Sequence, residues 1–469
     1  MSPLKSAYDL ACERIIAPKN IRRDYEPEDE PLDFVDIPEF SNRSDLVLDN
    51  NETKLILDPK AAREEKKQEK EFLDIQVQEA HSISYGDKIM EVCWNGNFLD
   101  YGGFARMNRT MAFGLSNRNV KVKIEIEPYL DHVNEATKNE LKRLSNIQIS
   151  KTAPKVFGAT IPINLSCGGK KILYTMIETS EKVHPDYAGK LNLVDEIWVA
   201  TEYGKSILKK SNVHPPIYVM PLGVDIKRYN SNAGLMDFGP SMKKFKFVSV
   251  FRWGYRKGYD ILLRAYMREF SAEDDVSLIL VSRPVLTPEE NGNKSIIEDF
   301  NDIKQSIGRA ENELPHVALY GNKIGERDMP KIYNSADAFV LFSRGEGFGL
   351  IYIEAGACGI PVIGTKCSGQ SDFLNDENSY LIEPDDYVEA KITGNLSHVA
   401  KSCRFYENQL FPEFREKGTA KAREHMRFVY ENYKEAKEKA KKLQSLVVNN
   451  YTWDMAVDRV YKRLREIGD

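Results

Sequence analysis

The sequence predicts an α/β protein in which two Rossmann-like, doubly wound parallel-sheet domains face each other across a cleft. Three observations support this fold class. The chain has 469 residues, which is more than one hydrophobic core normally serves. Short apolar runs typical of strands alternate with helix-like segments in two separate series, and a polar linker at residues 230–246 divides the two. Such alternation is typical of parallel sheets with helices on both faces, which bind ligands at the carboxyl ends of their strands.

Residues 1–85 form an acidic and charged N-terminal extension that lacks this alternation. They hold an acidic, proline-containing stretch at residues 24–39 and a charged run at residues 60–71. Such a composition is typical of segments that bury too little apolar surface to form a core of their own. We therefore expect no catalytic role for the extension.

The first series predicts an N-terminal Rossmann-like domain over residues 86–232. Strands are expected at residues 89–94, 120–126, 171–177, 196–201 and 217–221, with helices at residues 104–117 and 202–211. The loop between the first strand and the first helix ends in Gly102 and Gly103. A glycine pair alone is a weak signal, because turns also use glycine for positive φ angles. Its place in the fold favours a close approach of the backbone to a ligand.

The second series predicts a C-terminal Rossmann-like domain over residues 233–450. Strands are expected at residues 247–251, 276–281, 317–320, 338–342, 361–364 and 380–382, and helices begin near residues 259, 328, 349 and 370. Residues 395–469 are predicted to form a helical tail. Apolar side chains at helical spacing within residues 451–469 predict a last helix that packs back across the domains.

The composition and the charge restrict the function classes. The chain has no run of 18 or more apolar residues and no signal-like N-terminus, so the sequence predicts a cytoplasmic protein. The whole chain carries a net charge of −5, whereas residues 88–230 hold 20 basic and 14 acidic residues, a net charge of +6. Arg106 and Arg109 lie in this basic region and are candidate ligand-binding residues. If the charge is functional the ligand is anionic, and the alternative is an ordinary solvated surface.

Two carboxylates, Glu346 and Glu354, lie eight positions apart around a glycine-containing turn that opens a predicted helix. The free N–H groups and the positive dipole end of a helix start suit a diphosphate. Either glutamate alone would fit an ordinary surface residue. The apolar neighbours of Glu354, however, predict a shielded carboxylate that needs a hydroxyl or cationic partner.

The segment Glu346–Glu354 resembles the Glu-x7-Glu signature of the family 4 retaining glycosyltransferases, which have the GT-B fold. Three more segments are similar to family elements and stand in the family's order: Pro221–Asp225, Phe251–Gly258 and Ala336–Val340. The resemblance covers residues 88–469. It implies an enzyme that moves a sugar from a nucleotide diphosphate sugar, linked to UDP or GDP, to an acceptor hydroxyl. It implies no cofactor and no required metal.

The resemblance also implies that the first domain binds the acceptor, with Arg106 and Arg109 as candidate acceptor-binding residues, and that the second domain binds the donor. It implies roles for residues of this donor domain. Arg252 and Lys257 would neutralise the donor diphosphate, and Glu354 would hold the ribose hydroxyls. The sugar and the phosphates would be held by Glu346 and by the backbone of Gly347, Phe348, Gly349 and Leu350. The base would be flanked by the stretch that includes Asn322 and Lys323.

In the acceptor domain, Gly102 and Gly103 would approach the donor phosphates. Glu178 stands where many relatives carry a histidine near the reacting carbon. This departure leaves the identity of any proton acceptor open, with His184 as the other candidate. Removal of Glu354 or of Lys257 is expected to abolish transfer while the fold stays intact.

Other interpretations remain open at this point. A nucleotide-sugar epimerase shares the architecture but needs no acceptor, and a pyridoxal-phosphate phosphorylase would need a Schiff-base lysine that no feature suggests. An inactive scaffold would not need the glutamates, the basic pair and the glycine turn together. The acceptor is expected to be a saccharide or a lipid-linked saccharide, with peripheral membrane contact possible. A hydroxylated base in nucleic acid is the minority alternative.

Overall fold

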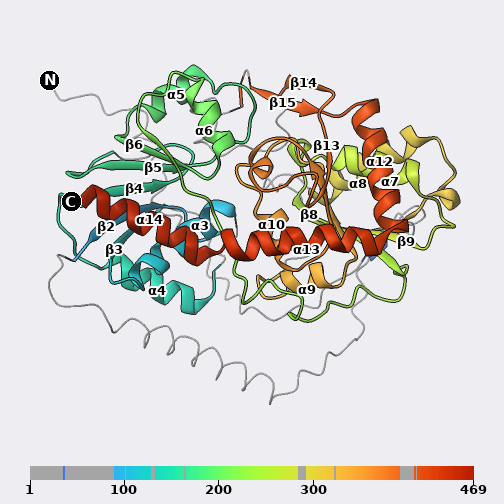
Figure 1. Cartoon of the computed structure of the whole chain (residues 1–469), viewed down its shortest axis with the longest axis horizontal. Helices are drawn as coiled ribbons and strands as arrows, with labels where there is room; N and C mark the ends of the chain where they lie inside the picture. Colours follow the sequence, from blue (N-terminus) through green and yellow to red (C-terminus); the bar gives the residue numbers. More distant parts are fainter. Residues whose placement is uncertain are drawn as a thin grey trace, which may run out of the picture. The chain divides into compact units, whose positions relative to one another are not determined.

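Two parallel sheets with covering helices organise the chain (Figure 1). The computed structural model describes residues 35–36, 89–100, 102–127, 133–162, 165–283, 292–321, 324–390, 406–407 and 409–468, and all of these lie in one compact unit, Phe34–Asp469. The proposed base-flanking residues Asn322 and Lys323 lie outside the described residues, as does the N-terminal extension apart from residues 35–36.

The first sheet has six parallel strands in the order β3-β2-β4-β5-β6-β7. These are β2 (Glu91–Gly96), β3 (Lys121–Ile126), β4 (Lys155–Gly158), β5 (Lys171–Thr175), β6 (Glu196–Val199) and β7 (Ile217–Val219). The helices of this domain are α3 (Gly103–Ser116), α4 (Glu135–Ser145), α5 (Pro185–Leu191) and α6 (Glu202–Lys209). Trp94 on β2 is fully buried, and its indole N–H donates to Asn108 Oδ1 on α3 at 2.9 Å.

The second sheet has six parallel strands in the order β10-β9-β8-β11-β12-β13. These are β8 (Phe245–Arg252), β9 (Val276–Arg283), β10 (His316–Tyr320), β11 (Ala338–Val340), β12 (Val362–Thr365) and β13 (Tyr380–Ile382), and the short β1 (Val35–Asp36) pairs antiparallel with β10. Its helices are α7 (Tyr259–Glu269), α8 (Gly292–Ile307), α9 (Met329–Asn334) and α10 (Leu350–Ala357), with 3-10 turns η2 (Tyr255–Lys257), η3 (Glu311–Glu313) and η4 (Gly369–Asp372). The strand order reverses between β8 and β11, and ligands of such sheets bind at this switch point.

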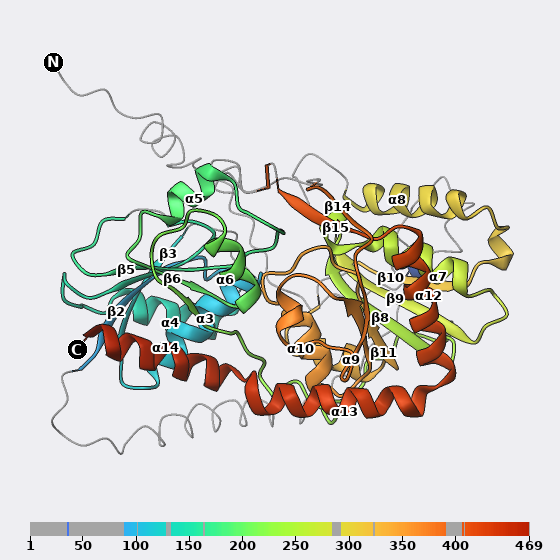
Figure 2. The same cartoon turned by 45° about the horizontal axis from the view of Figure 1, so that its top comes forward.

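A β-hairpin and three helices complete the chain. The hairpin joins β14 (Asp386–Glu389) antiparallel to β15 (Leu410–Glu413), and the helices are α12 (Glu416–Glu431), α13 (Tyr433–Asn450) and α14 (Trp453–Gly468). Figure 2 shows α13 beside α10 and α14 beside α3. Gly114 on α3 allows α14 to lie this close to α3. A Cβ at this position would clash with α14, because it would lie only 2.6 Å from a methyl carbon of Val457.

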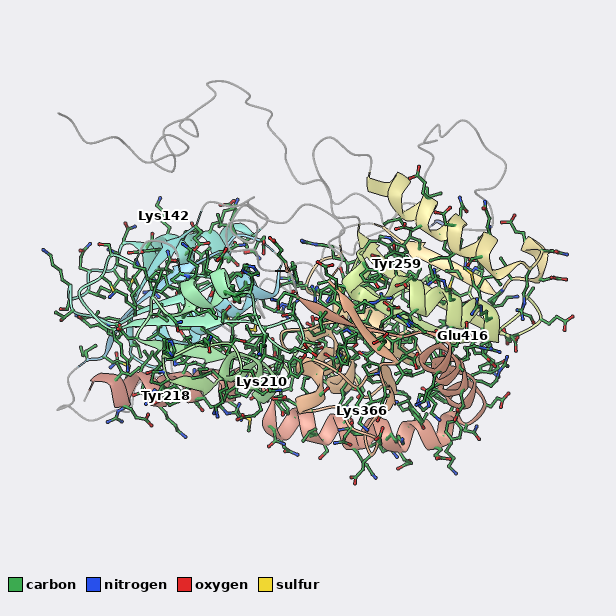
Figure 3. All side chains as sticks on the ribbon, turned by 90° about the horizontal axis from the view of Figure 1, so that it is seen from above. Lys142, Lys210, Tyr218, Tyr259, Lys366 and Glu416 are labelled. Carbon is green, nitrogen blue, oxygen red and sulfur yellow. The ribbon has the colours of Figure 1, made fainter. Side chains whose placement is uncertain are left out.

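The end of α14 is fixed to the first sheet through one buried carboxylate, Glu196, which is fully buried on β6. Arg463 of α14 donates to its two oxygens at 2.8 and 2.7 Å, and Lys170 Nζ lies 2.8 Å away. The Arg463 guanidinium also lies 3.9 Å from the ring centroid of Tyr218, which Figure 3 labels beside the ribbon of α14. A buried carboxylate with several charged donors holds an element in one register.

The predicted fold class, with a C-terminal helical tail, is confirmed, although residues 410–413 of the predicted tail form strand β15 and its first described helix is α12. Elements that were not predicted include β4, α4, α5 and the β14–β15 hairpin. Hydropathy does not identify β4 as a buried strand, because the strand begins with a charged residue. This residue, Lys155, is nevertheless only 1 % exposed. Its ammonium pairs with Glu125 at 2.7 Å. The helix expected near residue 370 is only the 3-10 turn η4, and α8 was also missed.

Among the described residues, no helix combines the length and the apolar character needed to cross a membrane.

Candidate active site

The candidate site lies at the switch point of the second sheet, where β8 and β11 end. The loop after β8, residues 253–258, and the loop after β11, residues 341–349, touch each other there. Gly258 has φ +66°, and a Cβ at this position would lie 1.9 Å from the carbonyl oxygen of Phe342. Only glycine fits both the backbone angle and the close contact.

Arg344 holds the two loops together, and its side chain is fully buried. It donates to both oxygens of Asp260 at 2.7 and 2.9 Å and to the carbonyl of Tyr255 at 2.8 Å. It also donates to Glu413 of β15 at 3.2 Å, and its guanidinium lies 3.8 Å from the ring centroid of Tyr255. Sequence reasoning missed this residue because nothing in the local pattern separates it from a surface arginine.

Lys257 and Glu346 meet at the centre of this arrangement. Lys257 Nζ donates to Glu346 Oε1 at 2.5 Å, and the hydroxyl of Ser343 donates to the same oxygen at 2.8 Å. Arg256 lies 3.8 Å from Glu346 Oε2 and donates to the carbonyl of Gly345. Burial raises the pKa of Glu346, but the charges of Lys257 and Arg256 outweigh it and hold the pKa below its ordinary value. Glu346 is therefore ionised at neutral pH.

The pKa of Lys257 is lowered from its usual 10.5, chiefly by burial, although the charge of Glu346 acts in the opposite direction. If Lys257 binds an anion as an ammonium, that binding is present at lower pH and is lost as the pH rises through the lowered pKa. We expect kcat/KM for an anionic substrate to fall along an alkaline limb that begins below pH 10.5. A pH profile of Lys257→Arg is the control, because an arginine stays charged and removes that limb. An identical limb in the variant would contradict this assignment.

The start of α10 presents backbone N–H groups at the same edge. Gly349 precedes the helix with φ +102°, a left-handed conformation that favours glycine. In the part of the chain that the structure describes, the amides of Gly347, Phe348 and Gly349 donate to no protein acceptor. The side chain of Phe348 is buried against the rings of Phe373 and Tyr451, 5.4 and 6.0 Å away between centroids. The turn is thus anchored by an aromatic side chain while its amides remain available to an anion.

Glu354 on α10 is only 2 % exposed, and both of its oxygens have partners. Arg106 of α3 donates to Oε1, and the hydroxyl of Tyr333 donates to Oε2 at 3.0 Å. The sequence predicted a shielded carboxylate with a hydroxyl or cationic partner, and this one has both. Arg106, predicted to bind the acceptor, is here an ion-pair partner of a predicted donor residue.

The arginine beside Glu346 is Arg256 and not the predicted Arg252. Arg252, predicted to neutralise the donor diphosphate together with Lys257, lies exposed at the end of β8 and makes no side-chain hydrogen bond or ion pair within the described residues. Arg256 is the arginine beside Glu346, because the turn η2 directs its side chain toward the loop after β11. Arg252 is therefore open to a ligand, and Arg256 is a site residue that the sequence spacing did not identify.

The glycine pair of the first domain lies near α10. Gly102 caps α3 and donates its N–H to Asp100 Oδ1 at 2.6 Å. A Cβ at Gly103 would lie 3.8 Å from Leu350 Cδ1. The structure thus brings Gly102, Gly103 and Leu350 to one place. Gly347 is similarly close to the first domain, since a Cβ there would lie 2.5 Å from Met176 Cβ.

Glu178 follows β5 and also reaches this edge. Its Oε1 lies 3.4 Å from Arg256 Nη1, and the hydroxyl of Tyr406 donates to Oε2. His184, the other candidate proton acceptor, instead caps α5, where its Nδ1 accepts the N–H of Asp186 at 3.1 Å. The structure therefore places Glu178, and not His184, beside the site.

The basic field predicted for the first domain is largely paired within the protein. Arg109 is 8 % exposed and donates to the carbonyls of Phe98 and Asp100 at 2.7 and 2.6 Å, so it holds the loop before α3 and does not fit an open acceptor contact. Arg118 lies 2.7 Å from Asp458 of α14. A count of charges overlooks such pairing, and the argument for an anionic acceptor is weakened accordingly.

Comparison with known proteins gives a family match within the second domain. Residues 243–401 match the family described as Glycosyl transferases group 1. A GDP-mannose-dependent monoacylated alpha-(1-6)-phosphatidylinositol monomannoside mannosyltransferase of Corynebacterium glutamicum is 27 % identical over 187 residues, which cover 37 % of this chain and 44 % of that protein. A D-inositol 3-phosphate glycosyltransferase of Segniliparus rotundus is 32 % identical over 171 residues, which cover 35 % of each chain. The chain thus spans less than half the length of these relatives.

Comparison with solved structures extends over both domains. HepE of Anabaena, crystallised with UDP and glucose, is 14 % identical with a TM-score of 0.55, and the match covers 80 % of this chain and all of that chain. At this identity the likeness concerns the fold alone. The chain therefore has the GT-B fold of two Rossmann-like domains, and its second domain carries the region that is shared with the group 1 glycosyl transferases.

Proposed function

We propose that this chain is a retaining glycosyltransferase that transfers a sugar from a nucleotide diphosphate sugar to an acceptor hydroxyl. The observation that carries the proposal is the anion-binding edge at the ends of β8 and β11. There Lys257 and Arg256 lie beside Glu346, and the amides of residues 347–349, before α10, donate to no acceptor within the described residues. This edge lies inside the region that matches the group 1 glycosyl transferases.

The diphosphate of the donor is the leaving group, and its negative charge grows as the bond to the sugar breaks. Lys257, the exposed Arg252 and the amides at the start of α10 would stabilise that charge. Fixed cationic and N–H donors of this kind are usually the largest contribution to catalysis. In a same-face displacement the departing phosphate oxygen takes the acceptor proton, so the protein needs no nucleophile of its own.

Glu346 and Glu354 would hold the sugar hydroxyls and the ribose hydroxyls of the donor. Both carboxylates already accept hydrogen bonds in this structure. A carboxylate has about four lone-pair sites, so each has the capacity for a further hydroxyl donor. The ion pairs of Glu346 with Lys257 and of Glu354 with Arg106 would keep the carboxylates oriented before the donor arrives.

The nucleoside of the donor is proposed to be uridine or guanosine. Names of similar proteins include a GDP-mannose-dependent enzyme and a protein crystallised with UDP. The acceptor is proposed to be a saccharide or a lipid-linked saccharide. No required metal is proposed, since arginine and lysine supply the positive charge beside the diphosphate.

The experiment is a transfer assay with a panel of UDP- and GDP-sugars and saccharide acceptors, run in excess EDTA. The proposal predicts acceptor-dependent release of the nucleoside diphosphate and a product with the anomeric configuration of the donor. Conversion of the donor to its epimer without an acceptor would identify an epimerase instead. Activity that is lost in EDTA and restored by magnesium or manganese would contradict the metal-independent mechanism.

A further inference from the structure

Tyr406, Gln409 and Leu410, which lie just before and at the start of β15 in the second domain, contact the first domain. Their partners are three successive residues of the loop after β5. The hydroxyl of Tyr406 donates to Glu178 Oε2, and the hydroxyl of Thr179 donates to the side-chain oxygen of Gln409 at 2.8 Å. The N–H of Ser180 donates to the carbonyl of Leu410 at 3.0 Å. Residues 178, 179 and 180 thus each contact the second domain, at Tyr406, Gln409 and Leu410, and the bridge between Ser180 and Leu410 is antiparallel.

The same region also contacts the loop after β11. A Cβ at Gly345 would lie 2.0 Å from the carbonyl oxygen of Glu178 and 3.3 Å from Phe411 Cε1. The ring of Phe411 packs on that of Tyr406, with 5.8 Å between centroids. Glu178, Tyr406 and the loop that carries Glu346 thus form one packed group.

Arg256 alone cannot fix the position of Glu178, because its guanidinium is shared. It lies 3.4 Å from Glu178 and 3.8 Å from Glu346, and it donates to the carbonyl of Gly345. Both side chains keep about a quarter of their surface exposed, 25 % for Arg256 and 23 % for Glu178. A second, directional donor is needed to hold one rotamer of a partly exposed carboxylate.

We propose that Tyr406 is a positioning residue for Glu178, so that a side chain of the second domain orients the carboxylate of the first domain that the family resemblance places near the reacting carbon. This inference rests on the proposed transferase function and names a residue outside the motifs that suggested it. Burial and the charge of Glu178 raise the pKa of Tyr406 well above its ordinary value. The hydroxyl therefore stays protonated and remains a hydrogen-bond donor at neutral and moderately alkaline pH.

The contacts separate the effect of Tyr406 from donor binding. Its hydroxyl donates to Glu178, whereas the proposed diphosphate contacts are made by Lys257 and the start of α10. Loss of the hydroxyl would leave Glu178 to the shared Arg256 and lower the fraction of molecules with the carboxylate in place. Turnover is then expected to fall while donor affinity is kept.

The test compares Tyr406→Phe with Tyr387→Phe, a matched removal of a hydroxyl from β14 of the same hairpin at a side chain that is 46 % exposed. We expect Tyr406→Phe to lower kcat about tenfold or more, in line with the loss of a hydrogen bond to a charged group, with donor KM changed less than about twofold. Tyr387→Phe is expected to match the wild type. In the background of Glu178→Gln, Tyr406→Phe should have little further effect, because the two residues act as a unit.

Amide hydrogen exchange of residues 178–180 gives a readout that needs no turnover. Faster exchange in Tyr406→Phe than in Tyr387→Phe is expected. Equal exchange, equal kcat, or a rise in donor KM that parallels the fall in kcat would overturn the positioning role. A wild-type protein that transfers no sugar would contradict the proposed function, and the exchange comparison would still decide whether Tyr406 holds Glu178.

Discussion

Lys257→Ala is expected to lower kcat/KM for the nucleotide sugar by about 10²–10³-fold, the usual cost of removing one electrostatic contact to a developing charge. The fold should persist, because Glu346 keeps its hydrogen bond from Ser343 at 2.8 Å and its neighbour Arg256 at 3.8 Å. Steady-state kinetics with varied donor, together with the melting temperature, measure both effects.

The matched control for that substitution is Lys366→Ala. Lys366, labelled in Figure 3, is 42 % exposed and pairs with Asp376 at 3.0 Å. The variant Lys366→Ala therefore also removes a lysine from an ion pair. A surface pair of this kind contributes little. We expect this variant to be unchanged in kcat/KM. Activity of Lys257→Ala within threefold of the wild type would contradict the assignment of Lys257 to the donor diphosphate.

Glu354→Ala is expected to lower both transfer and the free energy of unfolding. The sequence predicted an intact fold for this variant, but the structure shows a carboxylate that is 2 % exposed and bound by Arg106 and Tyr333. Breaking a buried pair by removing one partner costs about 3–5 kcal/mol. We expect the lower end of that range, because 23 % of the Arg106 side chain remains exposed to water. Chemical denaturation measures this loss directly.

Two further variants separate the ion pair from other effects at that site. Glu354→Leu combined with Arg106→Met and Tyr333→Phe removes both charges and the buried hydroxyl that would otherwise lose its acceptor, so it should recover stability while transfer stays lost. Glu416→Ala is the control for removal of an exposed glutamate from a helix, at the residue labelled on α12 in Figure 3. Unfolding free energies of Glu354→Ala and Glu416→Ala that agree within error would show that the pair does not hold α3 to α10.

The sequence predicts well which residue types form the candidate donor site, because each of its two main segments is short and continuous in the chain. The turn before α10 and the cations after β8 each occupy a short stretch with a fixed order of glycines and charges. The end of β8 determines whether Arg252 or Arg256 faces Glu346. The strand runs as far as Arg252, and η2 then directs Arg256 toward the site.

Contacts between distant parts of the chain are what the sequence could not supply. Arg106 and Glu354 are 248 positions apart, and Glu178 and Tyr406 are 228 apart. No local pattern records a pairing of this kind, since each residue alone fits a surface helix or a loop. For the same reason, the net charge of the first domain overstated the basic surface that is free to bind an anion. Arg109 and Lys155 are buried and bonded within the protein.

The central claim is that the edge formed by β8, β11 and the start of α10 binds a nucleoside diphosphate. Thermal unfolding of the wild type and of Lys257→Ala with UDP, GDP, uridine and guanosine tests it most directly, because a ligand that binds the native state raises the melting temperature by mass action. We expect UDP or GDP to stabilise the wild type, the nucleosides to have little effect, and Lys257→Ala to need at least about tenfold more diphosphate for the same shift. No stabilisation of the wild type by either diphosphate, or the same shift in the variant, would contradict the claim.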